Sequence, residues 1–231
     1  MKTHYLKTAR RRRGWTQQQA AARLGLSQPY LSMLETGRRS LPASLARRVV
    51  RLFALAPTAL PPSEPVKRRK AANNQTLAEE LAKLGYPGFA YLLTRCRTRN
   101  PAQVLLEALA MDDLEARLAE ALPWLLLQFE GLDAGWLSAQ VRLRNLQNRL
   151  GFVVSLARRV AEANPRRRNR VQPLLQLERD LEPSRLLQED TLCQSSLSVG
   201  ERRWLRARRP QAAAHWNLLT NWRPEHLPYA S

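Results

Sequence analysis

The segment Thr16–Gly37 constrains the fold of this 231-residue chain more than any other part of the sequence. Thr16 and Gln19 stand at the spacing of a capping box, in which each side chain bonds the other residue's backbone amide, so a helix is expected to begin at Gln17. Gly25 stands where that helix must end in left-handed backbone, which glycine adopts without steric cost. The segment therefore predicts a short helix that ends in a sharp turn.

A second short helix is predicted directly after the turn. Ser27 can cap it by accepting a hydrogen bond from an amide one turn further along. Leu31 and Leu34, three residues apart, give it one buried face, and the helix is expected to stop at Gly37. Two helices that meet at a steep angle through so short a turn form a helix-turn-helix.

The residues around this turn resemble those of the Cro/C1-type (XRE) family of DNA-binding domains, the fold of phage repressors. The resemblance extends over residues 5–53. The matching positions are Leu6, Arg10, Gly14, Thr16, Gln17, Ala21, Leu24, Gly25, Leu26, Ser27, Leu31, Leu34, Glu35 and Gly37. The resemblance implies an N-terminal lambda-repressor-like helix-turn-helix domain whose second motif helix presents its N-terminal end to the bases of DNA.

The resemblance also implies which residues read the bases. Gln28 matches the leading base reader, since a glutamine can bond the edge of an adenine with two hydrogen bonds. Ser32 and Met33 match further positions that face the groove. Pro29 has no donor and Met33 offers only an apolar contact, so we expect few direct bonds to bases and a contribution from DNA shape.

Three more positions carry roles by the same resemblance. Gln17 matches the glutamine with which the family contacts a phosphate. Arg10 and Glu35 match a partly buried ion pair that ties the first helix to the recognition helix. We interpret this pair as architectural, because ion pairs of this kind commonly position elements.

Positive charge is concentrated in the first third of the chain. The net charge is +19, from 38 Lys and Arg against 19 Asp and Glu. Residues 1–70 hold sixteen of the basic residues and only two acidic ones, whereas residues 71–231 hold twenty-two and seventeen. Only five of the 38 are lysine, which indicates a preference for arginine, but that preference does not account for the missing acids. The imbalance favours phosphate binding by the N-terminal part.

Basic runs supply the candidate contacts to the DNA backbone. We predict Arg11, Arg38 and Arg39 as phosphate contacts. The runs from which candidates are drawn are Arg10–Arg13, Arg38–Arg39, Arg47–Arg48 and Lys67–Lys70.

The sequence predicts an all-α protein in three parts. Residues 1–56 form the DNA-binding domain, with a first helix over 3–13 and a fourth from about Pro42. The inward stripe of that fourth helix is Leu45, Val49, Leu52 and Phe53. Residues 57–76 are expected to be a proline-rich basic linker, and 77–231 a larger helical domain for dimerisation or partner binding.

Helical signals mark most of residues 77–231. Helices are expected over 101–110, after a cap at Asp112 or Asp113, and from a second capping box of Ser198 with Glu201. The longest element is predicted over 135–163, with Gly151 allowing close packing. The stripe of that element is Leu143, Leu146, Leu150, Val153, Ala157 and Val160. A last helix after Pro210 is expected to carry Trp216, Leu218 and Leu219.

Chemistry is not expected of this second domain. Cys96 and Cys193 cannot make a metal site, and His215 and His226 are ill-spaced for one. We therefore predict no enzyme activity, no metal and no cofactor. With no signal peptide and no apolar run near the about 18–20 residues of a membrane span, we expect a cytoplasmic protein of bacterial or phage origin that associates with the nucleoid.

The sequence thus predicts a sequence-specific, DNA-binding transcriptional regulator. It is expected to bind operator duplex as a homodimer and to repress transcription, including that of its own gene. One alternative is the antitoxin of a toxin–antitoxin pair, which would also neutralise a toxin through residues 77–231, with Pro123–Phe129 and Trp216–Trp222 as candidate surfaces. A second alternative is an effector-sensing regulator with an apolar cavity. The basic loop Asn164–Arg170 is a further candidate contact for DNA or for a phosphate-rich partner.

Overall fold

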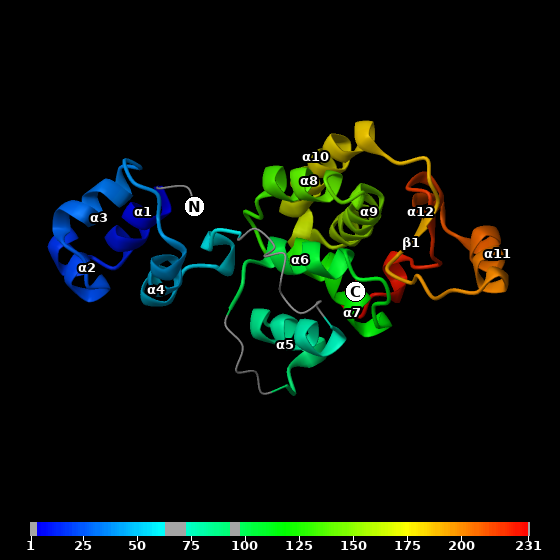
Figure 1. Cartoon of the computed structure of the whole chain (residues 1–231), viewed down its shortest axis with the longest axis horizontal. Helices are drawn as coiled ribbons and strands as arrows, with labels where there is room; N and C mark the ends of the chain where they lie inside the picture. Colours follow the sequence, from blue (N-terminus) through cyan, green and yellow to red (C-terminus); the bar gives the residue numbers. More distant parts are fainter. Residues whose placement is uncertain (1–3, 63–72, 93–97, 231) are drawn as a thin grey trace. The chain divides into compact units, whose positions relative to one another are not determined.

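The computed structural model describes residues 4–62, 73–92 and 98–230, and helices dominate it (Figure 1). The all-α prediction is therefore confirmed. The chain divides into two compact units, residues 1–67 and 68–231. In the described residues the strands are two short ones, β1 (Asp190–Thr191) and β2 (Leu218–Leu219), which pair in parallel with Asp190 opposite Leu218.

The first unit is a bundle of short helices around one small core. The helices are α1 (His4–Arg12), α2 (Gln17–Leu24), α3 (Gln28–Glu35) and α4 (Ala43–Phe53), followed by the 3-10 turn η1 (Pro57–Ala59). The core consists of apolar side chains from all four helices: Leu6, Ala9, Ala20, Ala21, Leu24, Leu31, Leu34, Val49 and Phe53. Val49 and Phe53 are buried as predicted, together with Ala46, whereas Leu45 and Leu52 are only partly buried.

The turn between α2 and α3 has the predicted local chemistry. Both hydrogen bonds of the Thr16–Gln19 capping box are present, at 3.1 and 3.0 Å. Gly25 is left-handed with φ +61°, and the Ser27 hydroxyl accepts from the Tyr30 amide. A Cβ on Gly25 would lie 3.3 Å from Nη1 of Arg48, so Arg48 on α4 packs against this turn. The sequence rules for caps are sufficient here because each of these bonds is local.

The second unit is larger and centres on one long helix. Its helices are α5 (Asn74–Leu84), α6 (Pro101–Leu109), α7 (Ala116–Gln128), α8 (Ala134–Arg142), α9 (Gln147–Ala163), α10 (Val171–Leu181), α11 (Val199–Arg208) and α12 (Gln211–His215). The 3-10 turns are η2 (Pro87–Phe89), η3 (Pro165–Arg170), η4 (Glu182–Ser184) and η5 (Pro224–His226). Because α7, α8, α10 and α12 pack around α9, most of the residues of α9 are buried.

The prediction of one continuous helix over residues 135–163 is wrong. Residues 135–163 are divided between α8 and α9 by a turn in which Asn145 is left-handed, with φ +56°. Asparagine tolerates that conformation better than most non-glycine residues. The turn therefore forms without the glycine or proline that usually marks a helix boundary in a sequence. Leu143 consequently leaves the predicted stripe and is 77% exposed, while Leu150 and its successors remain buried.

The end of the chain also departs from the helical prediction. α12 stops at His215, Asn217 is left-handed with φ +51°, and Leu218 and Leu219 form β2 instead of continuing the helix. Trp216 packs on α9 at Gly151, where an added Cβ would lie 2.6 Å from the indole ring. The predicted close packing at Gly151 is therefore confirmed, with Trp216 as the neighbour.

Two predicted caps have different outcomes. The capping box of Ser198 with Glu201 starts α11 as predicted. Asp113 does not cap a helix: its carboxylate accepts from the backbone amide and the hydroxyl of Ser196, and α7 begins at Ala116. The competing partner lies 83 residues away, which no local pattern indicates.

Parts of the sequence prediction fall on residues outside the described ones. These are the basic run Lys67–Lys70, Cys96 and the middle of the predicted linker 57–76. η1 and the first residues of α5 lie within that predicted range. The predicted boundaries stay predictions. None of the described helices combines the length and apolar character needed to cross a bilayer.

Candidate nucleic-acid interface

A chain of side-chain hydrogen bonds links α1, α2 and α3. Arg10 donates to both carboxylate oxygens of Glu35, from Nε at 2.6 Å and from Nη2 at 3.0 Å. Gln17 donates from Nε2 to the same carboxylate at 3.0 Å. Gln28 in turn donates from Nε2 to Oε1 of Gln17 at 2.7 Å. The chain of bonds therefore begins at a buried ion pair and ends at the exposed start of α3.

The buried end of this network is fully charged. The Glu35 side chain is 1% exposed. Desolvation raises the pKa of Glu35, but the hydrogen bonds from Arg10 and Gln17 outweigh it and leave that pKa below its ordinary value. The bond to Glu35 raises the pKa of Arg10. Arg10 also donates from Nη1 to the carbonyl of Trp15, so it is committed to the fold and is not a free phosphate contact.

The exposed end of the network places two helix N-termini together. Gln17 and Gln28 are the first residues of α2 and α3, and the hydrogen bond between them brings these two ends into contact. Unpaired backbone amides give each N-terminus a partial positive charge, which favours an anion such as a phosphate. Sequence reasoning assigned these glutamines separately and missed the bond between them, because eleven residues separate them.

The remaining predicted base readers lie along α3. Gln28 and Pro29 are exposed, whereas Ser32 and Met33 are half-buried. Pro29 occupies the first turn of α3, where the missing amide costs no helical bond. The carbonyls of Ser32 and Met33 accept from the Thr36 hydroxyl, so the last turn of α3 is held by its own side chain.

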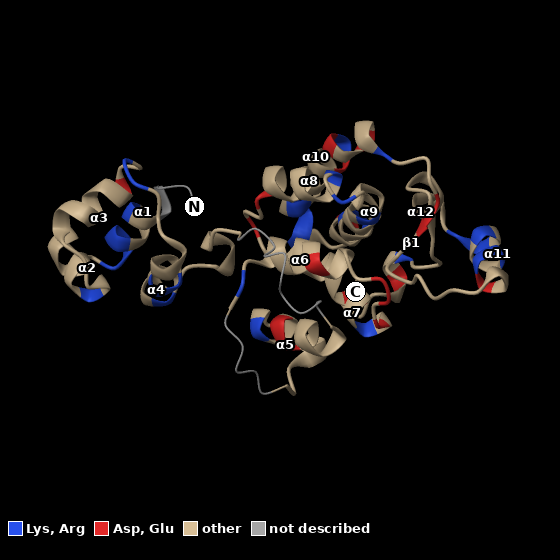
Figure 2. Cartoon of the chain, viewed as in Figure 1, with Lys and Arg blue, Asp and Glu red and all other residues tan. Residues whose placement is uncertain are grey.

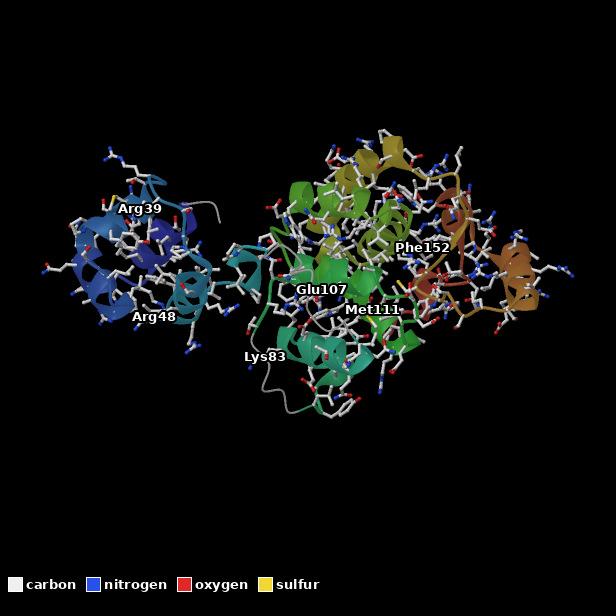
Figure 3. The ribbon with its side chains drawn as sticks, in the orientation of Figure 1. Arg39, Arg48, Lys83, Glu107, Met111 and Phe152 are labelled. Carbon is white, nitrogen blue, oxygen red and sulfur yellow. The ribbon has the colours of Figure 1, made fainter. Side chains whose placement is uncertain are left out.

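Of the predicted phosphate contacts, Gln17 is half-buried and the three arginines are exposed. Arg11 lies near the end of α1, and Arg38 and Arg39 follow α3. Figure 2 shows the basic residues of this unit and Figure 3 labels Arg39. The Arg39 guanidinium lies 5.7 Å from the centroid of the Tyr30 ring, which fixes its direction without neutralising it.

A second stacked arginine was not predicted. The Arg23 guanidinium lies 4.3 Å from the centroid of the Trp15 ring, and Trp15 also contacts Phe53. Trp15 is thus part of the core, as its apolar surroundings indicate, and Arg23 covers its outer face.

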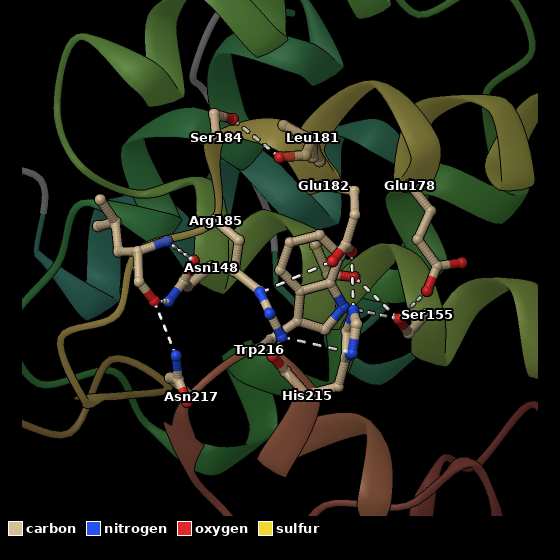
Figure 4. Close-up of polar contacts among 12 residues, drawn as sticks. Asn148, Ser155, Glu178, Leu181, Glu182, Ser184, Arg185, His215, Trp216 and Asn217 are labelled. Atoms are coloured by element: carbon tan, nitrogen blue, oxygen red, sulfur yellow. Dashed lines mark hydrogen bonds and ion pairs between the residues drawn. The ribbon is translucent and has the colours of Figure 1, made fainter.

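A cavity of about 300 Å³ lies between α9, α10 and α12 of the second unit. Six of its seven lining side chains are polar: Ser155, Arg158, Arg159, Glu178, Gln211 and His215. Several are already paired, and Figure 4 shows Ser155 bonded to Glu178 and His215 to Glu182. The Trp216 indole donates to the same Ser155 oxygen at 3.1 Å. These bonds tie the three helices together.

Cys193 and His215 are two side chains of the second unit whose surroundings constrain their chemistry. Cys193 is a buried free thiol, and burial raises its pKa to about 11, so it is protonated at neutral pH. His215 forms its hydrogen bond with Glu182 at 2.7 Å. Among the residues that the structure describes, no cluster of three or more His, Cys, Asp or Glu is arranged to hold a metal ion.

Comparison with known proteins gives one match. No curated protein and no solved structure matches the chain. A family model described as a helix-turn-helix domain matches residues 3–61, the segment that contains α1 to α4 and η1. The N-terminal unit of this chain is therefore a helix-turn-helix domain.

Proposed function

We propose that this protein is a sequence-specific DNA-binding transcriptional regulator of the Cro/C1 type. It acts as a dimeric repressor, and the genes that it represses include its own. The single observation that carries the proposal is the hydrogen-bond chain from buried Glu35 through Gln17 to Gln28. It fixes a polar side chain at the exposed start of α3, within a family-matched helix-turn-helix domain.

The donor count of the two glutamines fits a base contact and a phosphate contact. One N–H of Gln28 is used on Gln17, which leaves its second N–H and its oxygen free. That pair is what the major-groove edge of an adenine requires for two hydrogen bonds. Gln17 uses one N–H on Glu35 and retains the other, which suits a phosphate oxygen beside the two helix N-termini.

A dimer is proposed because one such module reads only half a site. Two copies related by a twofold axis would read half-sites about 34 Å apart, and the second contact raises affinity through effective concentration. We assign dimerisation to residues 77–231, and we propose that this region acts by binding and not by catalysis.

The two alternatives keep less support. For the antitoxin alternative, the stretches Pro123–Phe129 and Trp216–Trp222 were the candidate partner surfaces, but Trp124 and Trp216 are buried in the core. For the effector-sensing alternative, the expected sign was an apolar cavity, whereas the cavity beside α12 is lined mainly by polar side chains.

The experiment that tests the proposal is selection of duplexes by the full-length chain from a random-sequence pool. We expect enrichment of a palindrome with half-site centres about 10–10.5 base pairs apart. Gln28→Ala should lose about 1–3 kcal/mol on the selected duplex and nothing on random duplex. Recovery of an unenriched pool would overturn the proposal, and equal loss on both duplexes would remove Gln28 as a base reader.

A further inference from the structure

α11 carries arginines on two sides, and those that face its own unit are paired. Leu205 is the one buried residue of α11. Arg206 donates from Nε to Oε2 of Glu189 at 3.0 Å, and Arg209, just past the helix, lies 3.7 Å from the same oxygen. The arginine pairing lowers the pKa of Glu189. On this side the arginines attach α11 to the rest of its unit through Glu189.

The outward side of α11 has a different composition. Its residues recur at helical spacing and are Gly200, Arg203, Trp204, Ala207 and Arg208. Among the described residues, no carboxylate pairs with Arg203 or Arg208. The Arg208 guanidinium lies 4.8 Å from the centroid of the Trp204 ring, and Trp204 is 47% exposed. The stack orients this cation without neutralising it.

Nothing acidic on the helix offsets these charges. The one acidic residue of α11 is Glu201, and it bonds Ser198 in the capping box at the start of the helix. Figure 2 shows α11 at one edge of its unit, with blue segments that mark its arginines. The planar guanidinium groups on this exposed helix face match pairs of phosphate oxygens.

We propose that the outward face of α11, with Arg203 and Arg208 as its contacts, is a second nucleic-acid site that binds the phosphate backbone of duplex DNA flanking the sequence read by α3. The inference rests on the proposed function, because α3 would bring the chain to DNA and so raise the effective concentration of duplex near α11. A contact made to phosphates alone is independent of sequence and weakens with salt.

The test measures the salt dependence of binding of the full-length chain to a labelled random-sequence duplex that is long enough to hold two half-sites and their flanks. Arg203→Ala with Arg208→Ala should make the slope of log K against log[salt] shallower by about 1.8, since each phosphate contact contributes about 0.9. Lysine at both positions should restore most of the slope, because counterion release depends on charge. Unchanged thermal unfolding would confirm that the alanine variant folds.

The matched control is Arg159→Ala with Arg179→Ala. It removes the same charge from exposed positions on α9 and α10 of the same unit. We expect the slope of this control to equal that of the wild type. Equal slopes for the α11 variant and the wild type, or equal changes in the α11 variant and the control, would overturn the proposal. Binding to phosphatidylserine vesicles that needs Arg203 and Arg208, with an unchanged DNA slope, would also overturn it.

The failure of this inference is distinguishable from failure of the proposed function. The α11 substitutions are repeated in the Gln28→Ala background, in which base reading is removed. A shallower slope there, together with an unenriched pool for the wild type, would support the α11 contact and overturn the proposed function. Clear sequence selection by the wild type with no effect of the α11 substitutions would do the reverse.

Discussion

In the first unit nearly every described arginine is exposed, whereas the second unit also contains arginines that are buried or half-buried against carboxylates. In the first unit Arg11, Arg38 and Arg39 are exposed, and Arg10 is the one that is buried against a carboxylate. In the second unit buried or half-buried arginines bond carboxylates: Arg99 bonds Glu80 and Glu107, Arg149 bonds Asp190, and Arg158 bonds Glu178 and its helical neighbour Glu162.

The difference shows how one residue type produces two properties. An arginine between two carboxylates adds a fixed, neutralised crosslink, as Arg99 does between α5 and α6. An arginine without a carboxylate adds to the field around the molecule and attracts phosphates. The composition alone does not separate these roles, because it records charge and not pairing. The shortage of acids in residues 1–70 does indicate where the unpaired group lies.

The largest expected effect comes from removing a buried crosslink. The Arg149 side chain is 9% exposed, binds both oxygens of Asp190, and donates to the carbonyls of Leu109 and Met111. Arg149→Ala removes the donor to the two carbonyls and the partner of the half-exposed Asp190, so we expect a loss of about 3 kcal/mol in the unfolding free energy. Urea unfolding followed by tryptophan fluorescence measures it. Arg179→Ala, an exposed control, should change it by less than about 0.5 kcal/mol, and a similar change in both would contradict the comparison.

A smaller loss of stability is expected when the buried ion pair between Arg10 and Glu35 is removed. The pKa of Glu35 is lowered from its ordinary value of 4.5, so the pair stabilises the first unit fully above that pH. Its contribution is lost as the pH falls through the lowered pKa. Glu35→Gln should therefore weaken the protection of α1–α4 amides in hydrogen exchange at pH 7, and the deficit should shrink towards pH 3. A deficit that is independent of pH would rule out the charged pair.

The smallest effects on stability are expected at the exposed arginines. Arg11→Ala, Arg38→Ala and Arg39→Ala should each change the unfolding free energy by less than about 0.5 kcal/mol. Each should reduce the salt slope of DNA binding by about 0.9 on any duplex, because a phosphate contact carries no sequence information. Fluorescence anisotropy at several salt concentrations measures the slope. Three unchanged slopes would show that the backbone contacts lie elsewhere.

How far the sequence predicts the structure depends on how local the cause is. The first unit follows the prediction closely, because the Thr16 capping box, the left-handed Gly25 and the Ser27 cap each act within one helical turn. In the second unit no glycine or proline marks the turn at Asn145 between α8 and α9, and the pairing of β1 with β2 joins Asp190 to the distant Leu218. The partners Arg149 and Asp190 stand 41 residues apart, and no spacing rule connects them.

The same limit applies to the candidate site. Family resemblance assigned Arg10 and Glu35 to an ion pair, and Gln17 and Gln28 separately to a phosphate and a base contact. The structure joins all four through the Glu35 carboxylate and two hydrogen bonds that the glutamine side chains donate. Helical spacing cannot predict that junction, because the four residues come from three helices. The α11 face has a sequence signal in its arginines, but pairing of Arg206 and not of Arg203 is visible only in three dimensions.

Pro29 has a consequence for how the protein would meet its target. Proline fixes φ near the helical value before and after folding, so the first turn of α3 has few alternative conformations to lose. Because Gln17 already holds the Gln28 side chain, little conformational entropy is lost when α3 binds a duplex. A recognition surface of this kind gains affinity from being rigid and loses the ability to adapt. It would therefore tolerate few variant half-sites, and it would distinguish them mainly by how fast they dissociate.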